Sequence, residues 1–324
     1  MRRAWLAALA LLAVQAHAQV PLQQLQLLSE HPVEGMTGGN LSGLALCDGQ
    51  LWTVSDRDDR VLYRLDRTQT VWQAEAHEFE VPEPHSDLPA RLRSLATLST
   101  VVRGGALDYE GISCDAAGNR YVVSEANAAV LKVPVQGAAS WLALPPELVA
   151  QARAKGMLQH FNAIFEGIAV DPQGERLWLA AERQERGLLV VRREGEQWRC
   201  APDCVLYAQV DHPPTGRADK AITSWDFADL SLYQGKLFTL ERSVYRICRR
   251  DPEDGVAGRC WSFGREARQP QRRYDQPYGL TEALVIDDTG AWIGTDNNFG
   301  ARADGEKRPV VWRFAAPAGG WSAP

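Results

Sequence analysis

A pattern that recurs five times along the chain constrains its fold most. Each copy has a short apolar run, a turn containing glycine, a second short run and an acidic residue directly after it. These acids are Asp56, Glu125, Glu182, Glu241 and Asp296, at spacings of 69, 57, 59 and 55 residues. Short strands repeated at such intervals are typical of a propeller, in which sheets surround a central axis. We therefore predict an all-β fold, a β-propeller.

The number of copies predicts the number of blades, and the direct count favours five. Only a short tail rich in Pro, Gly and Ala follows the last copy, so we expect PLQQLQLLSE, from Pro21, to supply the outermost strand of the final blade. Six blades are the alternative, because residues 67–106 hold two further strand-like runs, TVWQAEAHEFEV and LATLSTVV. One short helical insertion is expected at Pro145–Gly156, which begins with Pro and Glu and ends with Gly.

Turn and aromatic residues recur with the same period. The turns DGQ, AAGN, PQGE, YQGK and DTGA each place a glycine where a tight hairpin favours positive φ. Trp52, Trp178 and Trp292 occupy one equivalent strand position. We expect them to pack between sheets as core aromatic residues.

The first 18 residues are typical of a secretory signal peptide, with two arginines, an apolar stretch and an Ala-His-Ala end. Cleavage after Ala18 would remove two positive charges and change the formal net charge from −6 to −8. Residues 19–324 are then expected to form a single domain that is periplasmic or secreted. No other apolar run is long enough for a membrane span.

Charge and motifs exclude several function classes. An acidic chain without a block of Lys and Arg argues against nucleic-acid binding, because phosphate backbones favour basic patches. Acidity fits cation binding better, and we expect a monomer acting on a small anionic substrate. The patterns G-x-S-x-G, H-E-x-x-H, G-x-x-x-x-G-K-[ST] and G-x-G-x-x-G do not occur, which argues against a serine-elbow hydrolase, a zincin, a P-loop protein and a Rossmann fold.

All six cysteines lie after the expected cleavage site, and an even number in an exported chain indicates three disulfides. Six cysteines allow 15 pairings. We expect Cys47–Cys114 between neighbouring copies, Cys200–Cys204 within one loop and Cys248–Cys260 across a turn. A zinc site at CAPDC is the alternative, but no matching Cys/His pair stands nearby.

A second set of acids is expected near the first. Glu110, Glu166 and Glu282 begin the first run of their copies, where Ser42 and Ala228 stand in the other two. In an antiparallel hairpin the start of one strand and the end of the next share an edge. Both sets should therefore surround one mouth of the central channel. The alternative is structural: acids at strand ends also cap backbone N–H groups or pair with arginines.

Basic and amide side chains accompany these acids. Arg57, Arg183 and Arg242 directly follow an acid, Asn297 and Asn298 follow Asp296, and His160 and Asn162 precede Glu166. Carboxylates bind hard cations such as calcium, and arginines bind anionic oxygens. The expected metal ligands are Glu110, Glu166, Glu282, Asp296, Asp56 and Glu125. The expected substrate-binding residues are Arg57, Arg183, Arg242 and Asn297. The expected catalytic residues are Glu110, Glu166 and His160, the last as a proton carrier.

With these residues the chain resembles the phytase-like domain family, described as having esterase-like activity of phytase. The matching motifs are LSGLAL…LWTVSDR, DYEGIS…GNRYVVSEANAAVLKV, NAIFEGIAVDPQGERLWLAAER and TEALVIDDTGAWIGTDNNFG, which together extend from about Gly39 to Phe314. The resemblance implies an exported bacterial propeller that hydrolyses phosphoesters or esters with calcium. The chain departs from the pattern in its fourth copy, which has ADL instead of EG, and in its fifth, which has TEA.

Three functions remain open at this point. The first is a calcium-dependent hydrolase of a phosphoester or another anionic ester. The second is a binding or scaffold propeller of the cell envelope without chemistry, since propellers serve both purposes. The third is a sugar-lactone hydrolase, because a metal in an acidic channel would suit that reaction too.

Overall fold

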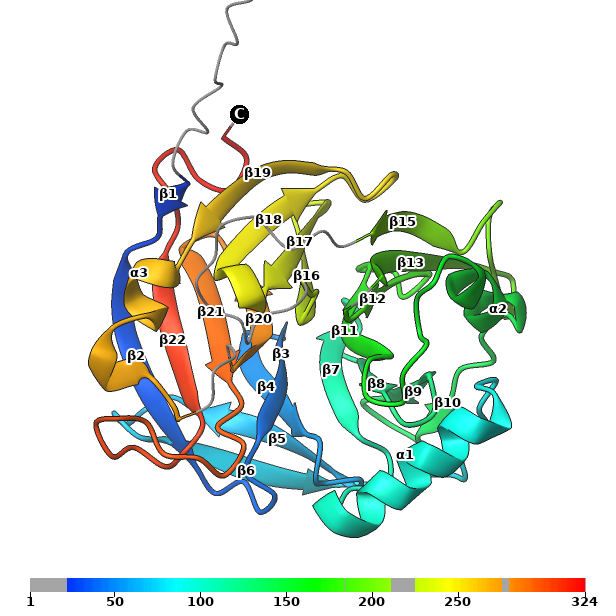
Figure 1. Cartoon of the computed structure of the whole chain (residues 1–324), viewed down its shortest axis with the longest axis horizontal. Coiled ribbons are helices and arrows are strands. Elements are labelled where there is room, and N and C mark those ends of the chain that lie inside the picture. Colours follow the sequence, from blue (N-terminus) through cyan, green and yellow to red (C-terminus); the bar gives the residue numbers. More distant parts are fainter. Residues whose placement is uncertain (1–21, 184, 211–224, 276–279, 324) are drawn as a thin grey trace, which may run out of the picture.

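The structure is a computed structural model that describes residues 22–183, 185–210, 225–275 and 280–323. Its strands are arranged around a central axis, as Figure 1 shows, and helices are few. The predicted signal peptide, residues 1–18, lies outside the described residues. In the described part of the chain, no helix is long and apolar enough to cross a membrane.

The strands form antiparallel sets that follow one another along the chain. The first set is β3 (Leu41–Cys47), β4 (Gln50–Ser55), β5 (Val61–Asp66) and β6 (Trp72–Glu78). The next is β7 (Tyr109–Cys114), β8 (Arg120–Ser124), β9 (Ala129–Val133) and β10 (Ser140–Trp141). Then come β11 (Phe165–Val170), β12 (Arg176–Ala181) and β13 (Glu185–Glu194), with β14 (Gln197–Arg199) and β15 (Val205–Val210) both paired to β13.

Two further sets complete the arrangement. One is β16 (Asp229–Tyr233), β17 (Lys236–Glu241), β18 (Arg246–Arg250) and β19 (Ala257–Ser262). The other is β20 (Thr281–Ile286), β21 (Gly290–Thr295) and β22 (Val310–Ala315). The first strand of each set contacts the first strand of the next, in the order β3, β7, β11, β16, β20 and back to β3. These innermost strands therefore enclose the axis, in a propeller-like arrangement.

A strand from near the N-terminus completes the last set, as the sequence predicted. β2 (Leu27–Glu34) pairs antiparallel with β22, with Glu30 opposite Trp312. It begins later than expected, because β1 (Gln23–Gln24) pairs instead with β19, in parallel. The other end of β2 pairs in parallel with β6, so the first and last sets share one eight-stranded sheet.

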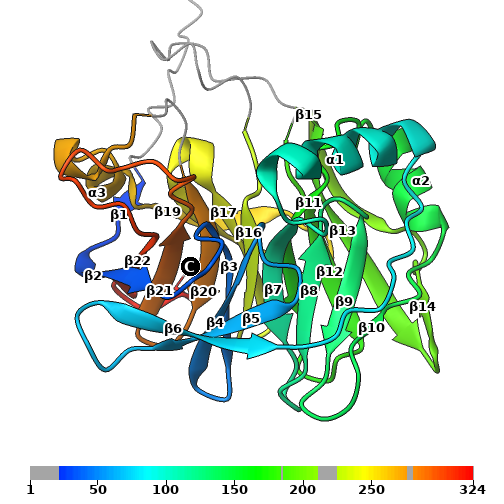
Figure 2. The same ribbon diagram turned by 90° about the horizontal axis from the view of Figure 1, so that it is seen from below.

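The helices differ in part from the expectation. α2 (Glu147–Ala154) lies within the predicted helical insertion. It is not the only helix, because α1 (Ala90–Arg103) forms where the six-blade alternative required LATLSTVV to be a strand. Leu92 and Ala96 are buried four residues apart, the spacing of one face of a helix. The short α3 (Gly264–Ala267), η1 (Arg242–Val244) and η2 (Pro270–Arg272) follow later. In Figure 2, α1, α2 and α3 lie towards the same face of the molecule.

The predicted hairpin glycines are confirmed in four turns and differ in the fifth. Gly49, Gly118, Gly174 and Gly235 have φ between 68° and 79°. Gly290 is not among the positive-φ residues. A Cβ there would lie 1.8 Å from the carbonyl oxygen of Phe314, so this glycine allows a close approach to β22.

The equivalent tryptophans bind arginines as well as packing. Trp52 and Trp178 are buried, as expected, and Trp292 is half-buried. The guanidinium carbon of Arg120 lies 4.1 Å from the ring centroid of Trp52. Arg176 and Arg313 lie in the same way over the other two, at 4.4 and 4.2 Å. These positions are cation–π sites as well as core positions.

The expected disulfides form: Cys47–Cys114, Cys200–Cys204 and Cys248–Cys260. The first joins the ends of the neighbouring inner strands β3 and β7. No cysteine of the described chain is free, so the zinc alternative at CAPDC is wrong. Three disulfides fit an oxidising compartment.

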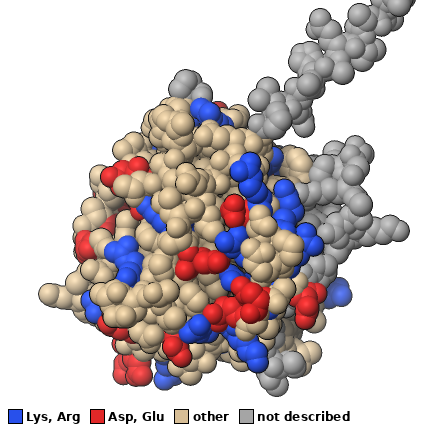
Figure 3. Space-filling view, turned by 90° about the vertical axis from the view of Figure 1, so that its left-hand side faces the viewer, with Lys and Arg blue, Asp and Glu red and all other residues tan. Residues whose placement is uncertain are grey.

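Surface charges of opposite sign are interspersed on the face that carries β2 and α3, as Figure 3 shows. Many of them pair. Glu30 on β2 binds Arg272 and Arg302, with N–O distances of 3.1 and 3.0 Å. Arg308 binds Glu306 at 2.8 Å. The charges of this face are therefore largely compensated within the protein.

Candidate functional site

The glutamates expected at the start of inner strands stand on β-bulges. Between the first residues of β3, β7, β11 and β20, the pairing with the next strand shifts by one residue. The extra residues are Ser42, Glu110, Glu166 and Glu282. A bulge leaves its extra residue outside the ladder and re-aims its side chain. The side chains of these four residues therefore do not follow the alternation of side chains between the two faces of their strands.

The glycine of the EG motif permits neighbouring inner strands to approach. A Cβ on Gly111 would lie 2.8 Å from the carbonyl oxygen of Glu166, and one on Gly167 would lie 2.6 Å from the Cα of Asp229. Both distances are shorter than any ordinary Cβ contact. The motif thus combines a bulged acid with a residue that fits only without a side chain.

In the fourth set the described pairing begins at Asp229 opposite Leu240, which corresponds to Gly43 opposite Val54 in the first set. Ala228 stands directly before that pair, as Ser42 stands before Gly43. The glutamate position of the fourth copy is therefore held by an alanine, which supplies no ligand. The Asp229 carboxylate accepts hydrogen bonds from the backbone N–H groups of Leu230 and Leu284, both at 2.7 Å. Burial raises the pKa of Asp229. Because Leu284 belongs to β20, the Asp229 carboxylate joins β16 to β20.

Two groups of three acids converge at the acidic mouth, the end of the channel to which the bulges belong. The first acid triad is Asp56, Asp108 and Glu110, with one oxygen of each within 4.8 Å of the others. The two aspartates are buried and Glu110 is partly exposed. Burial, together with the neighbouring Glu166 and Asp108, raises the pKa of Glu110 well above its ordinary value.

Side chains from β3 and its approach hold the first acid triad in place. Asn40 Nδ2 donates to Asp56 Oδ1 at 3.1 Å, and Ser42 Oγ accepts a hydrogen bond from the Asp56 N–H at 3.3 Å. Arg57 Nε lies 3.1 Å from the other carboxylate oxygen of Asp56. Ser42, which stands in a glutamate position, therefore orients an acid instead of supplying one.

The second acid triad is Glu125, Glu166 and Glu182, again with one oxygen of each within 4.8 Å of the others. All three are buried. Glu125 Oε1 accepts a hydrogen bond from the N–H of Ile164 at 2.9 Å. Burial raises the pKa of Glu125 and Glu166, and it raises that of Glu182 to about 8 despite Arg242 and Arg183 nearby.

Arg242 lies beside the second acid triad and binds carboxylates on several sides. Its Nη2 pairs with Glu182 Oε1 and its Nη1 with Glu282 Oε2. Its Nε binds Asp226 Oδ2 at 2.5 Å, and Glu166 Oε2 is 3.9 Å from Nη1. Burial raises the pKa of Glu282 to about 8, although Arg242 acts in the opposite direction.

Asp296 and the residues after it form the rim beside β20. Burial and the nearby Asp56 raise the pKa of Asp296 to about 7. Its Oδ1 accepts a hydrogen bond from the N–H of Asn298 at 2.7 Å. Asn297 donates from Nδ2 to the carbonyl oxygen of Lys307 at 2.9 Å, so its amide holds the loop that leads to β22. The ring of Phe299, which is exposed, lies 5.3 Å from the guanidinium carbon of Arg57.

Two expected members of the mouth lie apart from these acids. Glu241 is fully buried and pairs with Arg186, Arg246 and Arg250. Burial raises its pKa, but the three arginines outweigh this effect and hold it below the ordinary value. His160 is exposed, and among the described residues no hydrogen bond or ion pair joins its imidazole to an acid. Arg183 pairs with Glu182, and its side chain is 34% exposed.

Sequence reasoning missed three residues of the mouth, Asn40, Asp108 and Asp226. Asn40 and Asp108 stand two positions before the bulged residues Ser42 and Glu110. Asp226 stands in the same way two positions before Ala228 in the fourth copy. A comparison of that position across the copies would have shown three polar residues there.

The donor set of the mouth fits a hard cation such as calcium. It consists of oxygen atoms, which calcium prefers. Three buried oxygens also lack a hydrogen-bond partner among the described residues: Asn40 Oδ1, Glu182 Oε2 and Asn297 Oδ1. Buried polar atoms are rarely left without a partner, so these oxygens are suited to a bound ion or water.

The two ends of the channel differ in chemistry. A cavity of about 310 Å³ at the other end is lined mainly by apolar residues of every inner strand, among them Leu44, Ile112, Val170, Leu230 and Leu284. A cavity of about 650 Å³ between α1 and the segment after β8 adjoins the acidic mouth. Its walls include Ala106, two residues before Asp108, and Ala126, directly after Glu125.

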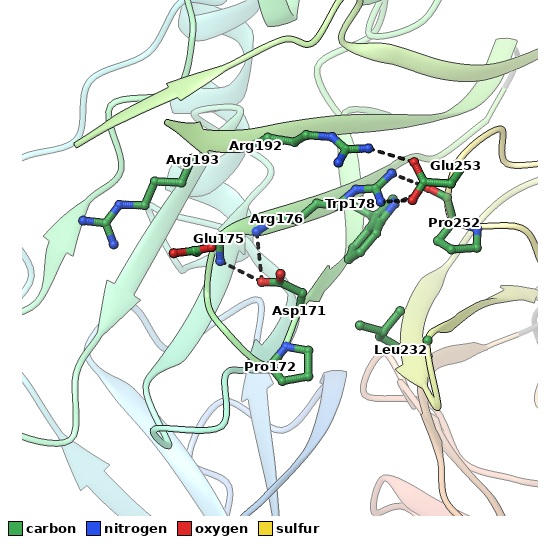
Figure 4. Close-up of a pocket in the computed structure, with 11 residues that line it drawn as sticks. Asp171, Pro172, Glu175, Arg176, Trp178, Arg192, Arg193, Leu232, Pro252 and Glu253 are labelled. Atoms are coloured by element: carbon green, nitrogen blue, oxygen red, sulfur yellow. Dashed lines mark hydrogen bonds and ion pairs between the residues drawn. The ribbon is translucent and has the colours of Figure 1, made fainter. Parts of the chain in front are cut away.

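A further pocket, of about 450 Å³, lies between the third and fourth strand sets (Figure 4). Arg176 and Arg192 point to Glu253 from the far side of the pocket and pair with it. Arg176 also covers the ring of Trp178, whose Nε1 donates to the carbonyl oxygen of Pro252 at 3.0 Å. These charged groups pair with one another and so join the two sets. The acidic mouth is therefore the stronger candidate for the functional site.

Known structures resemble this chain in fold. Myxococcus xanthus glutaminyl cyclase is 10% identical, with a TM-score of 0.51 over 91% of this chain and 97% of that one. Staphylococcus aureus virginiamycin B lyase is 12% identical, with a TM-score of 0.40 over 89% and 74%. XC5397 of Xanthomonas campestris, a gluconolactonase, is 10% identical, with a TM-score of 0.43 over 90% and 88%. At such identities the likeness concerns the fold alone.

The curated proteins contain no sequence match to this chain. A family model described as "Phytase-like: Esterase-like activity of phytase" matches residues 37–244. The match includes both acid triads and Arg242, and it covers more than half of the chain. The chain therefore belongs to the phytase-like family, as its repeated motifs indicated.

Proposed function

We propose that this protein is an exported, calcium-dependent hydrolase of phosphoesters or other anionic esters, with its active site at the acidic mouth. The observation that supports this most is the first acid triad, in which three carboxylates converge and one of them, Glu110, is partly exposed. The family description agrees with an esterase-like activity.

Asp56, Asp108 and Glu110 would hold the calcium ion, with the amide oxygen of Asn40 beside them. When bound, such an ion neutralises substrate charge and lowers the pKa of a coordinated water. Glu110, whose pKa is raised by burial and by neighbouring acids, would carry a proton at its carboxylate.

The remaining groups would bind the substrate. Arg183 is the most exposed arginine of the mouth and is proposed to bind an anionic oxygen, with Arg57 at the opposite rim. The cavity of about 650 Å³ under α1 would take the part of the substrate away from the ester. Asn297 is proposed to position the rim loop, and His160 as a proton carrier depends on movement of its loop.

Further features belong to the same proposal. We infer that residues 19–324 form one domain with five blades, one for each inner strand in the ring β3, β7, β11, β16 and β20. We also infer a monomer that is cleaved near Ala18 and acts in the periplasm or outside the cell on a small anionic substrate. Glu282, Asp296 and Glu125 complete the acidic mouth around the proposed ion.

The test is calorimetric titration of calcium into chelator-treated protein, followed by assays with phosphoesters, carboxyl esters and lactones with and without calcium. We expect saturable binding and calcium-dependent turnover of an anionic ester. Glu110→Gln should remove both while the circular dichroism spectrum is unchanged. The matched control is Glu253→Gln, in the pocket between the third and fourth strand sets.

Other outcomes would contradict the proposal. Calcium binding without turnover would favour a binding propeller of the cell envelope. Turnover of lactones alone would favour the lactone hydrolase. Equal calcium affinity in the wild type and Glu110→Gln would exclude the first acid triad as the site.

A further inference from the structure

The two acid triads differ in the positive charge that already stands beside them. The second acid triad adjoins Arg242, whose guanidinium is in contact with Glu166, Glu182, Glu282 and Asp226. The first acid triad has Arg57, which is about as buried as Arg242 and is paired with Asp56. The two triads therefore differ in how the arginine is placed, because Arg242 is in contact with two members of its triad and with two further carboxylates.

Backbone geometry fixes Arg242 in that place. It begins the turn η1, directly after β17. Asp226 Oδ1 accepts a hydrogen bond from the N–H of Ser243 at 3.1 Å, while Asp226 Oδ2 binds Arg242 Nε. One carboxylate therefore holds both the turn and the guanidinium. The Arg242 side chain is only 11% exposed.

The second acid triad still has an oxygen suited to a cation. Glu182 is 1% exposed, and its Oε1 is bound by Arg242 and Arg183. Its Oε2 is buried and has no hydrogen-bond partner among the described residues. This oxygen, with those of Glu125 and Glu166, forms a set of ligands that a divalent cation could use.

A divalent cation at the second acid triad would have to share Glu166 and Glu182 with Arg242. A divalent cation bound to these carboxylates would lie close to the guanidinium of Arg242. Two positive charges that are close together repel each other strongly where water is excluded. A guanidinium does not lose its proton in proteins, so Arg242 cannot relieve this repulsion by becoming neutral. Occupation of the triad would require Arg242 to leave its carboxylates.

We propose that Arg242 is a built-in counter-ion that keeps divalent cations out of the second acid triad and thereby limits the acidic mouth to one metal ion. The ion binds at the first acid triad, and removal of the Arg242 charge opens a second site at Glu125, Glu166 and Glu182. The inference rests on the proposed function only in taking the first acid triad as the native site.

The experiment is calorimetric titration of calcium into chelator-treated wild type, Arg242→Met and Arg242→Lys. Methionine keeps much of the side-chain length without charge, and lysine keeps the charge. We expect about one equivalent of calcium in the wild type and in Arg242→Lys, and about two in Arg242→Met. The additional equivalent should disappear in the double variant Arg242→Met/Glu182→Gln.

Arg183→Met is the matched control, because Arg183 pairs with the same Glu182 oxygen but is much more exposed. Solvent screens an exposed charge, so this variant should bind about one equivalent. Two equivalents in the wild type, or the same number in a folded Arg242→Met as in the wild type, would overturn the proposal.

A folding measurement covers the case in which Arg242→Met is unstable. Loss of Arg242 leaves several buried acids without their cation, so the melting temperature of this variant should depend more steeply on calcium than that of the wild type. A variant that stays unfolded at all calcium concentrations would count against a second site.

The outcomes also separate this inference from the proposed function. Wild type without calcium binding but Arg242→Met with one equivalent would refute the calcium-dependent hydrolase and retain the counter-ion. Calcium-dependent turnover by a wild type that binds two equivalents of calcium would support the hydrolase and refute the counter-ion.

Discussion

At the scale of single residues, the surroundings of an acid decide its role. Glu182 directly follows β12, and Glu241 is the last residue of β17. Glu182 keeps a buried oxygen without a partner, and burial raises its pKa to about 8. Glu241 is paired with three arginines, and its pKa is lowered. The first has the properties of a ligand and the second those of a structural ion pair.

Asp108 is the residue whose substitution tests the first acid triad independently of Glu110. Asp108→Asn removes one of three converging carboxylates. We expect calcium affinity to fall by at least the roughly 10- to 100-fold that loss of an outer-shell partner causes. The measurement is the same calorimetric titration, and an affinity within about twofold of the wild type would place the ion elsewhere.

The raised pKa values of the mouth predict a dependence of stability on pH. Glu182 and Glu282 have pKa values of about 8, and Asp296 of about 7. Between their ordinary values and these, the folded state holds protons that the unfolded state has released. The free energy of unfolding therefore falls as pH rises through this window.

The check is thermal unfolding of chelator-treated protein at about pH 6 and about pH 8.5, on either side of the raised pKa values. The melting temperature should be lower at the higher pH. Saturating calcium should reduce the difference, because binding requires ionised carboxylates. A calcium-free melting temperature that rises over this range would contradict the assigned environments.

The sequence predicted much of the mouth because the repeat places equivalent residues at one edge. It identified Glu110, Glu166, Glu125 and Asp56, which the structure brings together in the two triads. It did not identify Asp108 or Asp226, because both stand before the first strand of their set, outside the two runs that define the repeat. Nor did it show that Glu241 is enclosed by arginines, because these come from neighbouring strands that no local pattern connects.

At the scale of elements, the bulge with its glycine is the unit that builds the mouth. Gly167→Ala would place a Cβ 2.6 Å from the Cα of Asp229. Backbone on both sides must then move, and overpacking of this kind costs about 1–3 kcal/mol. Denaturant unfolding should show this loss in the free energy of unfolding.

Gly258→Ala is the control for that variant. Gly258 does not have positive φ, and a Cβ there would find its nearest neighbour at 3.7 Å. Its stability should stay within about 0.5 kcal/mol of the wild type. Equal effects of the two substitutions would mean that the contact between β11 and β16 is not as close as described.

The elements themselves show where local sequence suffices. Hairpins with a turn glycine were predicted correctly because the pattern is contained in a few residues. α1 was not, because LATLSTVV suits both a strand and a helix, and the burial of Leu92 and Ala96 on one face of α1 favours the helix. The parallel pairing of β2 with β6 joins residues too distant for any local pattern.

At the scale of the whole molecule, the disulfides are expected to differ in how much they stabilise the folded protein. Cys47–Cys114 closes a loop of 67 residues, and Cys200–Cys204 closes one of 4. The entropy of loop closure then predicts a loss of about 4 kcal/mol for Cys47→Ala/Cys114→Ala, against about 2 kcal/mol for the other pair. Denaturant unfolding of the two double variants checks this order, and a reversed order would indicate that strain or residual structure dominates.

The pairing of β2 with β22 has a consequence for the time at which the molecule can be completed. β2 ends at Glu34 and β22 begins at Val310, so a ribosome synthesises the first strand long before its neighbour exists. Until then the early strand has one edge without hydrogen bonds, and unpaired strand edges promote aggregation. Closure of the ring must therefore be one of the last steps in the folding of this chain.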